Sequence, residues 1–150
     1  MQNPLLFIIL LIVKCNAEFQ FKCWAESCTK PNSLMQNVKV NFYPNPPVEG
    51  QKITGELDGT IMEKVTSGRV FVKAFFKNFP PLKETYDFCY LLSYLDKMQC
   101  PLPAGDVHFN YSTFLKTSSI LPGNYSGTAT ITNQMNDEVV CLKGGCEITG

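Results

Sequence analysis

The sequence predicts an all-β fold, an immunoglobulin-like sandwich of two antiparallel sheets with about seven strands, stapled by disulfide bonds. Short segments alternate between apolar and polar residues with the period of half-buried strands, and Pro and Gly clusters separate them like turns. After residue 17, no long segment has the period of a helix. The 150 residues, 45% hydrophobic and 17% charged, suit one globular domain.

Residues 1–17 are expected to be a signal peptide, which leaves residues 18–150 as the mature domain. The apolar run 5–13 is shorter than the roughly 20 residues that cross a bilayer, and Cys15-Asn16-Ala17 resembles a cleavage site. An uncleaved anchor is the alternative, because Lys14 follows the run instead of preceding it. Cleavage would remove Cys15, so that six cysteines remain for three disulfides in a secreted or lysosomal protein.

The cysteine positions predict how the two ends of the mature chain pair. Positions 23 and 146 have the same sum as positions 28 and 141, which is the register of antiparallel strands. The predicted bridges are Cys28 with Cys141, Cys23 with Cys146 and Cys89 with Cys100. Because the spacing of five residues is odd, the two terminal bridges belong on opposite faces, and at least one lies outside the regular strands or beside a bulge. A zinc site of two C-x4-C pairs is the alternative, which secretion disfavours.

The remaining strands are expected in chain order. They cover residues 36–43, 51–60, 69–78, 88–95, 106–113, 123–132 and 137–143. In 69–78 the even positions, such as Val70 and Val72, are all apolar and face inward. The same alternation places His108 on an outward face, and residues 80–83 are expected to form a loop.

Two glycosylation sequons agree with this assignment of faces. They are Asn110-Tyr111-Ser112 and Asn124-Tyr125-Ser126. A glycan needs a surface asparagine, and both Asn110 and Asn124 fall on outward faces. We therefore expect glycans at Asn110 and Asn124.

The sequence offers little for catalysis. His108 is the only histidine, and no nucleophile-elbow, zinc-protease, phosphate-loop or dinucleotide motif is present. The carboxylates of Glu56 and Asp58 share an outward face, where solvation explains them. The formal net charge of zero gives no global field for a nucleic acid. The prediction is therefore a protein that is not an enzyme and has no cofactor, no metal and no nucleic-acid partner.

Several inward positions are small where a sandwich core usually has bulk. They are Gly55, Gly59, Ala74, Gly127 and Ala129. Either large neighbours such as Phe76 and Tyr111 fill the space between the sheets, or an apolar cavity remains that suits an acyl chain or a sterol.

An aromatic and basic stripe runs along the outward face of residues 69–78. It consists of Phe71, Lys73, Phe75 and Lys77, and Phe79 follows it. Rings and ammonium groups together suit the surface of an anionic membrane. A loop that covers the rings while the lysines reach solvent is the alternative.

An ordered set of short motifs resembles one known family. The motifs are YPNPPVEGQ at 43–51, GT at 59–60, CPL at 100–102, GD at 105–106, LPGNY at 121–125 and CL at 141–142. Together they resemble the ML, or lipid-recognition, domain family. The phosphatidylglycerol/phosphatidylinositol transfer proteins are the most similar members, and lysosomal sterol carriers and ganglioside activators are more distant.

The resemblance implies a sandwich that holds lipid between its sheets, without catalytic residues or metal. It implies bridges between Cys28 and Cys141 and between Cys89 and Cys100, whereas Cys23 and Cys146 would form an added bridge. The long Cys89–Cys100 loop argues against sterol specificity.

These observations predict a secreted or lysosomal monomer that carries one phospholipid or sterol and contacts membranes transiently. The expected pocket residues are Val40, Phe42, Val72, Ala74, Phe76, Phe109, Tyr111, Ala129 and Ile131. The expected mouth residues are Phe79, Leu82, Phe114 and Ile120, and Phe71, Lys73, Phe75 and Lys77 would dock on the membrane. The alternative function is an extracellular recognition or accessory module with a filled core that binds a protein or glycolipid. A pocket of about 300 Å³ or more would favour the carrier.

Overall fold

A computed structural model describes residues 19–114 and 120–150, and the predicted signal peptide lies outside these residues. In the described part the chain forms eight strands and one helix, α2. They are β1 (Gln20–Ser27), β2 (Met35–Tyr43), β3 (Lys52–Ile61), β4 (Gly68–Phe76), β5 (Leu82–Asp87), α2 (Phe88–Leu95), β6 (Gly105–Phe114), β7 (Gly123–Asn133) and β8 (Glu138–Thr149). None of the described helices is long and apolar enough to cross a membrane.

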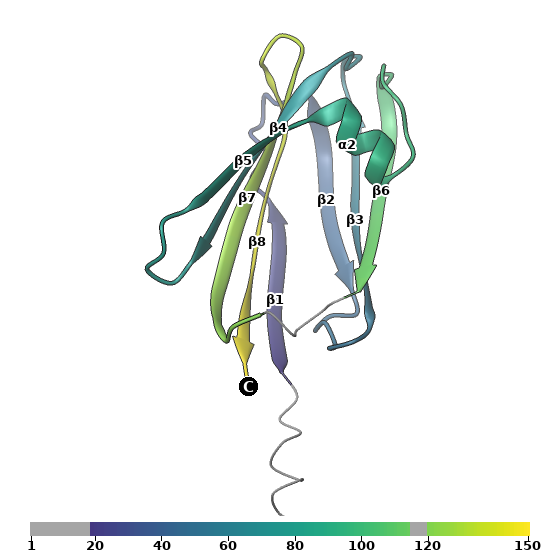
Figure 1. The fold of residues 1–150 in the computed structure, drawn as a ribbon. Coiled ribbons are helices and arrows are strands. Elements are labelled where there is room, and N and C mark those ends of the chain that lie inside the picture. The colour runs from purple at the N-terminus through teal and green to yellow at the C-terminus, as the bar shows by residue number, and fades with distance from the viewer. Residues whose placement is uncertain (1–18, 115–119) are drawn as a thin grey trace, which may run out of the picture.

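The strands form two antiparallel sheets that face each other (Figure 1). One sheet has five strands in the order β1-β8-β7-β4-β5, and the other has three in the order β2-β3-β6. The sheets approach each other where β1 lies beside β2, whereas α2 packs on β4 and β5 near the other side of the sandwich. The predicted two-sheet antiparallel sandwich is confirmed.

The terminal strands pair in the register that the cysteine spacing predicts. Cys23 lies directly opposite Cys146 in the β1–β8 ladder, and the two sulfurs are bonded. Cys28 follows the end of β1 and is bonded to Cys141, and its backbone N–H donates to the Cys141 carbonyl oxygen at 2.9 Å. One bridge therefore lies outside the regular ladder, as the odd spacing requires. The third bridge joins Cys89 and Cys100.

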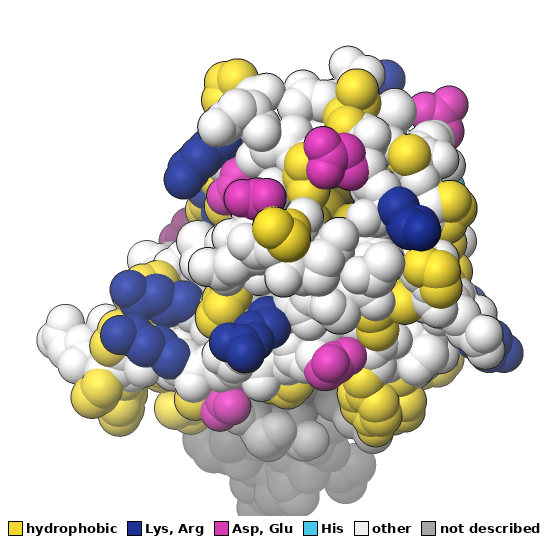
Figure 2. All heavy atoms as spheres, turned by 90° about the horizontal axis from the view of Figure 1, so that it is seen from above, with side chains coloured by type: hydrophobic (Ala, Val, Ile, Leu, Met, Phe, Trp, Pro, Cys, Tyr) yellow, Lys and Arg dark blue, Asp and Glu magenta, His cyan; other side chains and the backbone are white. Residues whose placement is uncertain are grey.

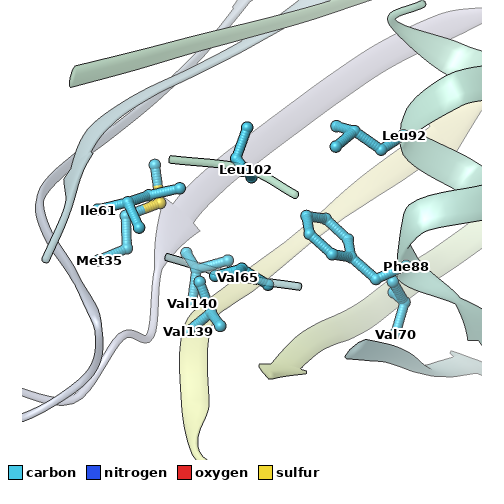
Figure 3. Close-up of a cluster of buried hydrophobic side chains, with 9 residues drawn as sticks. All are labelled: Met35, Ile61, Val65, Val70, Phe88, Leu92, Leu102, Val139 and Val140. Carbon is cyan, nitrogen blue, oxygen red and sulfur yellow. The ribbon is translucent and has the colours of Figure 1, made fainter. Parts of the chain in front are cut away.

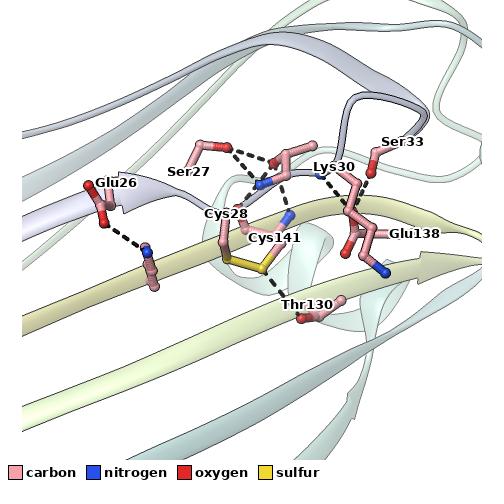
Figure 4. The surroundings of a disulfide bond; sticks show 10 residues. Glu26, Ser27, Cys28, Lys30, Ser33, Thr130, Glu138 and Cys141 are labelled. Carbon is pink, nitrogen blue, oxygen red and sulfur yellow. Dashed lines mark hydrogen bonds and ion pairs between the residues drawn. A yellow bond between two sulfur atoms is a disulfide. The ribbon is translucent and has the colours of Figure 1, made fainter.

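Polar contacts surround the Cys28–Cys141 bridge (Figure 4). The hydroxyl of Thr29 donates to the Cys141 carbonyl oxygen and accepts from the Cys141 backbone N–H, both at 3.1 Å. The hydroxyl of Ser33 donates to the Glu138 carboxylate, which also accepts from the Lys30 backbone N–H at 3.1 Å. These bonds fix the chain as it leaves β1 and turns toward the other sheet.

The expectation of a strand at residues 88–95 is wrong, because this segment is α2. The carboxylate of Asp87 accepts from the Tyr90 backbone N–H at 2.8 Å and caps the N-terminus of the helix. Phe88 and Leu92 are buried one turn apart, which is the helical spacing of a core face. The aromatic content of the segment favours a strand, but the cap and the apolar spacing prevail. The expected loop at 80–83 is also partly wrong, because β5 begins at Leu82 and pairs with β4.

The tightly packed core lies at the α2 end of the sandwich (Figure 3). It consists of Met35, Ile61, Val65, Val70, Phe88, Leu92, Leu102, Val139 and Val140. Figure 3 shows Phe88 and Leu92 reaching from α2 toward the strands. Met35, Val70, Val139 and Val140 come from the beginnings of β2, β4 and β8, and Ile61 comes from the end of β3, which are neighbours at one end of the sandwich. Val65 and Leu102 pair with each other in an isolated bridge outside the strands. The other end of the space between the sheets is not part of this core.

Candidate functional site

Two apolar cavities lie between the sheets, and the first adjoins the core, since Met35, Ile61, Val70, Phe88, Leu92, Val139 and Val140 line it. The first has a volume of about 490 Å³ and the second about 620 Å³. The hydrophobic wall of the first includes Val40, Leu57, Leu91, Leu95, Phe109, Tyr111 and Ile131. The wall of the second includes Phe21, Ala74, Phe76, Phe79, Pro80, Leu82, Ile120 and Ile148. Phe42 and Ile53 line both cavities, so the two spaces share a wall.

Small residues fall in one row across the five-stranded sheet, and two of them, Ala25 and Ala74, line the cavities. Ala25, Gly144, Gly127 and Ala74 are consecutive partners across β1, β8, β7 and β4. Without larger side chains, the row leaves room above the inner face of the sheet. On the facing sheet, a Cβ built on Gly55 would meet nothing within 4 Å. The sequence allowed either a filled space or an apolar cavity between the sheets, and in this region the structure has a cavity.

At Gly59, by contrast, large neighbours compensate for the missing side chain. A Cβ at Gly59 would approach the Met35 side chain to 2.5 Å, so Met35 already occupies that space. The filled alternative therefore holds at the core end of β3, and the cavity alternative holds at its other end.

Most of the expected pocket residues line these cavities. Val40, Phe109, Tyr111 and Ile131 line the first, Ala74 and Phe76 line the second, and Phe42 lines both. Val72 and Ala129 line neither. Val72 packs against the core cluster, and Ala129 lies beside it in the sheet, between Val72 and Leu142.

Sequence reasoning missed two groups of lining residues. Leu91 and Leu95 belong to α2, and their spacing with Phe88 and Leu92 was a helical signal within the segment expected to be a strand. The second group comes from the terminal strands and comprises Phe21, Cys23, Cys146 and Ile148. The Cys23–Cys146 bridge therefore forms part of the second cavity's wall.

The second cavity opens at the hairpin between β4 and β5. Phe79 and Leu82, which line it, are 64% and 59% exposed, and Ile120 lines it from the segment before β7. The Phe76 ring stacks on Phe79 at 5.7 Å and on Tyr125 at 4.2 Å between centroids. Three of the four expected mouth residues thus lie at this cavity. Phe114 is exposed but does not line it.

The expected docking stripe divides into two parts. Phe71, Lys73 and Phe75 lie in the alternating part of β4, where both rings are 38% exposed and the Lys73 Nζ lies 5.3 Å from the Phe75 ring centroid. Phe75 also lines the second cavity. Lys77 departs from the alternation, because its φ of 48° is left-handed. Its Nζ lies 5.0 Å from the centroid of Phe76, a ring that lines the second cavity. Lys77 is therefore a cation at the rim of this cavity.

Polar groups gather at the opening of the first cavity. Asp96, at the end of α2, and Asn110, on β6, line it together with Glu56, and the Asn110 backbone N–H donates to the Asp96 carboxylate at 3.3 Å. Leu95 and Tyr111 beside them are 38% and 48% exposed. Figure 2 views the molecule from the α2 end, where acidic and basic side chains are interspersed and several basic ones lie toward the left. Asp96 therefore places a carboxylate beside the apolar wall of the first cavity.

The outer face of the three-stranded sheet carries a ladder of polar pairs. His108 Nδ1 is hydrogen-bonded to the Asp58 carboxylate, which raises the pKa of this exposed histidine. The Tyr43 hydroxyl donates to Glu56 at 3.1 Å, and this bond raises the tyrosine's pKa. Neither His108 nor Asp58 lines a cavity. Among the described residues, no group of three or more His, Cys, Asp or Glu side chains could hold a metal ion.

The two sequon asparagines lie on the surface. Asn110 is exposed on β6 beside the first cavity, and Asn124 is exposed near the start of β7. Both positions leave their side chains accessible, as an acceptor site requires.

Comparison of the sequence with protein-family models gives a match to the ML domain over residues 22–148. A Dictyostelium discoideum protein provisionally named a phosphatidylglycerol/phosphatidylinositol transfer protein is 34% identical over 143 residues, with 91% of this chain and 88% of the relative covered. The phosphatidylglycerol/phosphatidylinositol transfer protein of Aspergillus oryzae is 29% identical over 120 residues, with 79% and 67% covered.

Two solved structures share the fold at low sequence identity. Chicken MD-1, solved in complex with lipid IVa, has a TM-score of 0.60 at 14% identity, and the match covers 85% of this chain and 89% of the MD-1 chain. A Niemann-Pick type C2 protein from the Japanese carpenter ant has a TM-score of 0.54 at 14% identity, with 81% and 96% covered.

Proposed function

Because the chain belongs to the ML domain family, we propose that it is a lipid carrier that holds one lipid between its sheets and moves it between membranes. The observation that carries the proposal is the pair of apolar cavities beside a core that is packed only at the α2 end. Relatives named as phosphatidylglycerol/phosphatidylinositol transfer proteins support a phospholipid as the ligand. The proposed role has no chemical step and needs no cofactor.

The alternative of a recognition module depends on a filled core. Both cavities exceed the volume of about 300 Å³ at which ligand pockets begin, so they favour the carrier. A carboxylate hydrolase would need free acids facing a cleft. Of the two acids that line the first cavity, Glu56 accepts from Tyr43 and Asp96 from the Asn110 backbone N–H.

We place the carrier in the secretory route as a monomer, secreted or in the lysosomal lumen. Three disulfide bonds support an oxidising compartment. The predicted signal peptide at 1–17 and glycans at Asn110 and Asn124 belong to the same proposal. Mass spectrometry of the protein from its native host would test the signal peptide, the disulfide bonds and the glycans, since it reports the mature N-terminus, the bridges and the glycan masses.

The membrane contact is assigned to the β4–β5 hairpin end. Phe79 and Leu82 present exposed apolar surface there, and Lys73, Lys77 and Lys83 supply positive charge on and beside β4 and β5. This combination complements a membrane with anionic headgroups. A lipid that leaves the second cavity would then pass directly into the bilayer.

A comparison of charge reversal at Lys77 and at Lys73 distinguishes docking at this end from nonspecific electrostatic attraction to the membrane. We expect Lys77→Glu to slow transfer to phosphatidylglycerol vesicles more than Lys73→Glu, because only Lys77 lies at the rim. Phosphatidylcholine vesicles are the control, because they carry no net charge. Both variants should transfer lipid to them at the wild-type rate. Equal rates for the wild type and Lys77→Glu on anionic vesicles would contradict docking at this end.

The carrier function itself is tested by extraction and transfer. The secreted protein is purified without detergent, its bound lipids are identified by mass spectrometry, and its transfer of fluorescent phosphatidylglycerol between vesicles is measured. We expect about one lipid per chain and transfer that rises with protein concentration. A protein that is always empty and moves no lipid would overturn the proposal.

A further inference from the structure

An aromatic strip crosses the outer face of the five-stranded sheet beside one of the two sequons. The strip consists of Trp24, Gly145, Ser126 and Phe75, which are consecutive partners across β1, β8, β7 and β4. We propose that an N-linked glycan at Asn124 folds back on this strip and covers it. This inference rests on the glycosylation proposed above and goes beyond it, because it assigns the glycan a binding surface on the protein itself.

The side chains of the strip point away from the three-stranded sheet. The strip lies between the row of Ala25 and Ala74 and the row of the Cys23–Cys146 bridge, and both of these rows line the cavities. Successive side chains of a strand point to opposite faces, so the strip between the two rows belongs to the outer face (Figure 1). The second cavity meets the strip from the inner side through its backbone, as Gly145 shows, since a glycine has no side chain.

Aromatic rings stand at both ends of the strip, with a low floor between them. Trp24 is 48% exposed, and the exposed Lys73 lies beside the ring of Phe75. A Cβ built on Gly145 would lie 3.0 Å from the Trp24 Nε1 and 2.5 Å from the Tyr125 carbonyl oxygen, so the indole leans over Gly145 and keeps this position small. Three strand spacings separate the two ends of the strip, a length of about 14 Å that suits a short oligosaccharide.

The sequon brings a glycan to the strip. Ser126 is the third residue of the sequon and belongs to the strip, and Asn124 lies two residues before it on the same face of β7. Both side chains are exposed. The two positions are separated by a rise of only about 7 Å along the strand. A group tethered this close reaches an effective concentration of about the millimolar range, so that even weak contacts with the strip become populated.

The strip has the chemistry that packs a sugar. The first rings of an N-linked glycan are N-acetylglucosamines, whose C–H groups on one face pack against the electron-rich face of an aromatic ring. The charged residues in the outward rows on either side of the strip have both signs, and they are Lys22, Glu147, Glu26, Lys143 and Lys73. Lys143 is paired with Glu26 at 3.0 Å. This mixed surrounding suits a neutral oligosaccharide better than an anionic membrane, which is attracted by a cluster of positive charge.

A covered strip also bears on how the carrier meets a membrane. The strip is the aromatic part of a broad sheet face, whereas Phe79 and Leu82 present apolar surface at the β4–β5 hairpin, where the second cavity opens. A hydrophilic glycan over the strip keeps this sheet face away from the bilayer. The hairpin end is then left as the surface that contacts the membrane.

Trp24 is the only tryptophan of the chain, so its fluorescence reports directly on the strip. The protein is secreted from a eukaryotic host, mass spectrometry gives the occupancy of each sequon, and quenching by acrylamide is measured. We expect Asn124→Gln to raise the Stern–Volmer constant by about twofold or more, because the open face of the indole loses its cover. Enzymatic removal of the glycans from the folded wild type, which needs no substitution, should give the same increase.

Asn110→Gln is the matched control. It removes an identical Asn-Tyr-Ser sequon, but from β6 in the three-stranded sheet, and should leave the quenching of Trp24 unchanged. NMR of the glycosylated wild type should also show nuclear Overhauser contacts between sugar protons and the Trp24 indole. Circular dichroism confirms that each variant is folded.

Four outcomes would overturn the proposal. If Asn124 carries no glycan, nothing covers the strip, and if quenching is unchanged when an occupied site is emptied, the glycan extends into solvent. If phosphatidylglycerol vesicles shield Trp24 in the glycosylated wild type, the strip is a membrane contact. If quenching depends on protein concentration, the strip binds a second copy of the chain. Lipid transfer by the same samples is a separate readout, since only a wild type that carries no lipid would refute the carrier function.

Discussion

Two of the three disulfide bonds are nested, and this makes a quantitative prediction about stability. Cys23–Cys146 spans a sequence separation of 123 residues, and Cys28–Cys141 spans 113. In the chain-entropy account, a single bridge across such a loop stabilises the folded state by about 5 kcal/mol. When the other bridge is intact, however, the unfolded chain is already closed at nearly the same point.

The second bridge then closes only the small ring made by residues 23–28 and 141–146. A ring of about a dozen residues is worth about 3 kcal/mol in the same account. We therefore expect the paired change Cys23→Ala with Cys146→Ala to lower the free energy of unfolding by about 3 kcal/mol. Removing both bridges should cost about 8 kcal/mol, more than twice the loss from either one.

The assay is urea denaturation without reductant, followed by far-UV circular dichroism and by fluorescence of Trp24. Trp24 is the single tryptophan of the chain and lies on β1 next to Cys23. The Cys89–Cys100 bridge is the internal control, because its separation of 11 residues is local and independent of the other two. Removal of the Cys89–Cys100 bridge should also lower the free energy of unfolding by about 3 kcal/mol. This loss should be additive with the loss from removing either nested bridge.

The reasoning would be refuted by a loss of about 5 kcal/mol for the first pair, which is the value for an isolated long loop. It would also be refuted if the losses from the two nested bridges simply added. The paired change Cys23→Ala with Cys146→Ala is preferred for this test. Cys23 and Cys146 line a cavity, so their removal disturbs little dense packing. At position 141 the sulfur also accepts from the Thr130 hydroxyl at 3.8 Å, so its removal changes more than the loop.

Two further predictions concern the core and the surface. Leu92→Ala, which truncates a 6% exposed side chain in the packed cluster, should lower the free energy of unfolding by about 2–5 kcal/mol, whereas Tyr94→Ala on the exposed side of α2 should change it by about 0.5 kcal/mol or less. Equal losses in urea denaturation would contradict the placement of the core. NMR titration should give a pKa for His108 above 6.5, and Asp58→Asn should bring it back toward that value. Since the folded-state pKa is the higher one, the pair's contribution to stability is present below about pH 6.5 and is lost as the pH rises through the folded-state pKa. An unchanged titration in Asp58→Asn would show that the hydrogen bond does not cause the shift.

Most strand positions and the pairing of the chain ends were accessible from sequence because each depends on a local or an arithmetic pattern, whereas the start of β5 was expected to be a loop. Alternation in 69–78 identifies β4 and its inward face, and the cysteine positions give the β1–β8 register without any knowledge of the strands between them. Such patterns survive folding, because a strand with one buried face cannot slip by one residue without exposing its apolar side chains.

The helix and the position of Lys77 were not accessible in the same way. Residues 88–95 are apolar and aromatic almost throughout, so their periodicity is weak, and the capping contact of Asp87 decides the local conformation. Lys77 fits the alternating stripe in the sequence, yet a left-handed turn after β4 moves it to the rim of the second cavity. A single backbone conformation therefore changes its expected role from outer-face docking to a position beside the ligand.

The contrast between Gly55 and Gly59 shows why the cavity could not be predicted from composition. Both glycines lie on the same inward face of β3, and the sequence treats them alike. A bulge in β2 at Asn37, whose φ is 55°, shifts the register between Gln36 and Lys39 and brings Met35 over Gly59. No such irregularity occurs opposite Gly55, whose ladder partners are Phe42 and Tyr111, and the space there stays open. The inserted residue in β2 thus coincides with the filled position at Gly59, and it leaves no mark on the alternation of β3 itself.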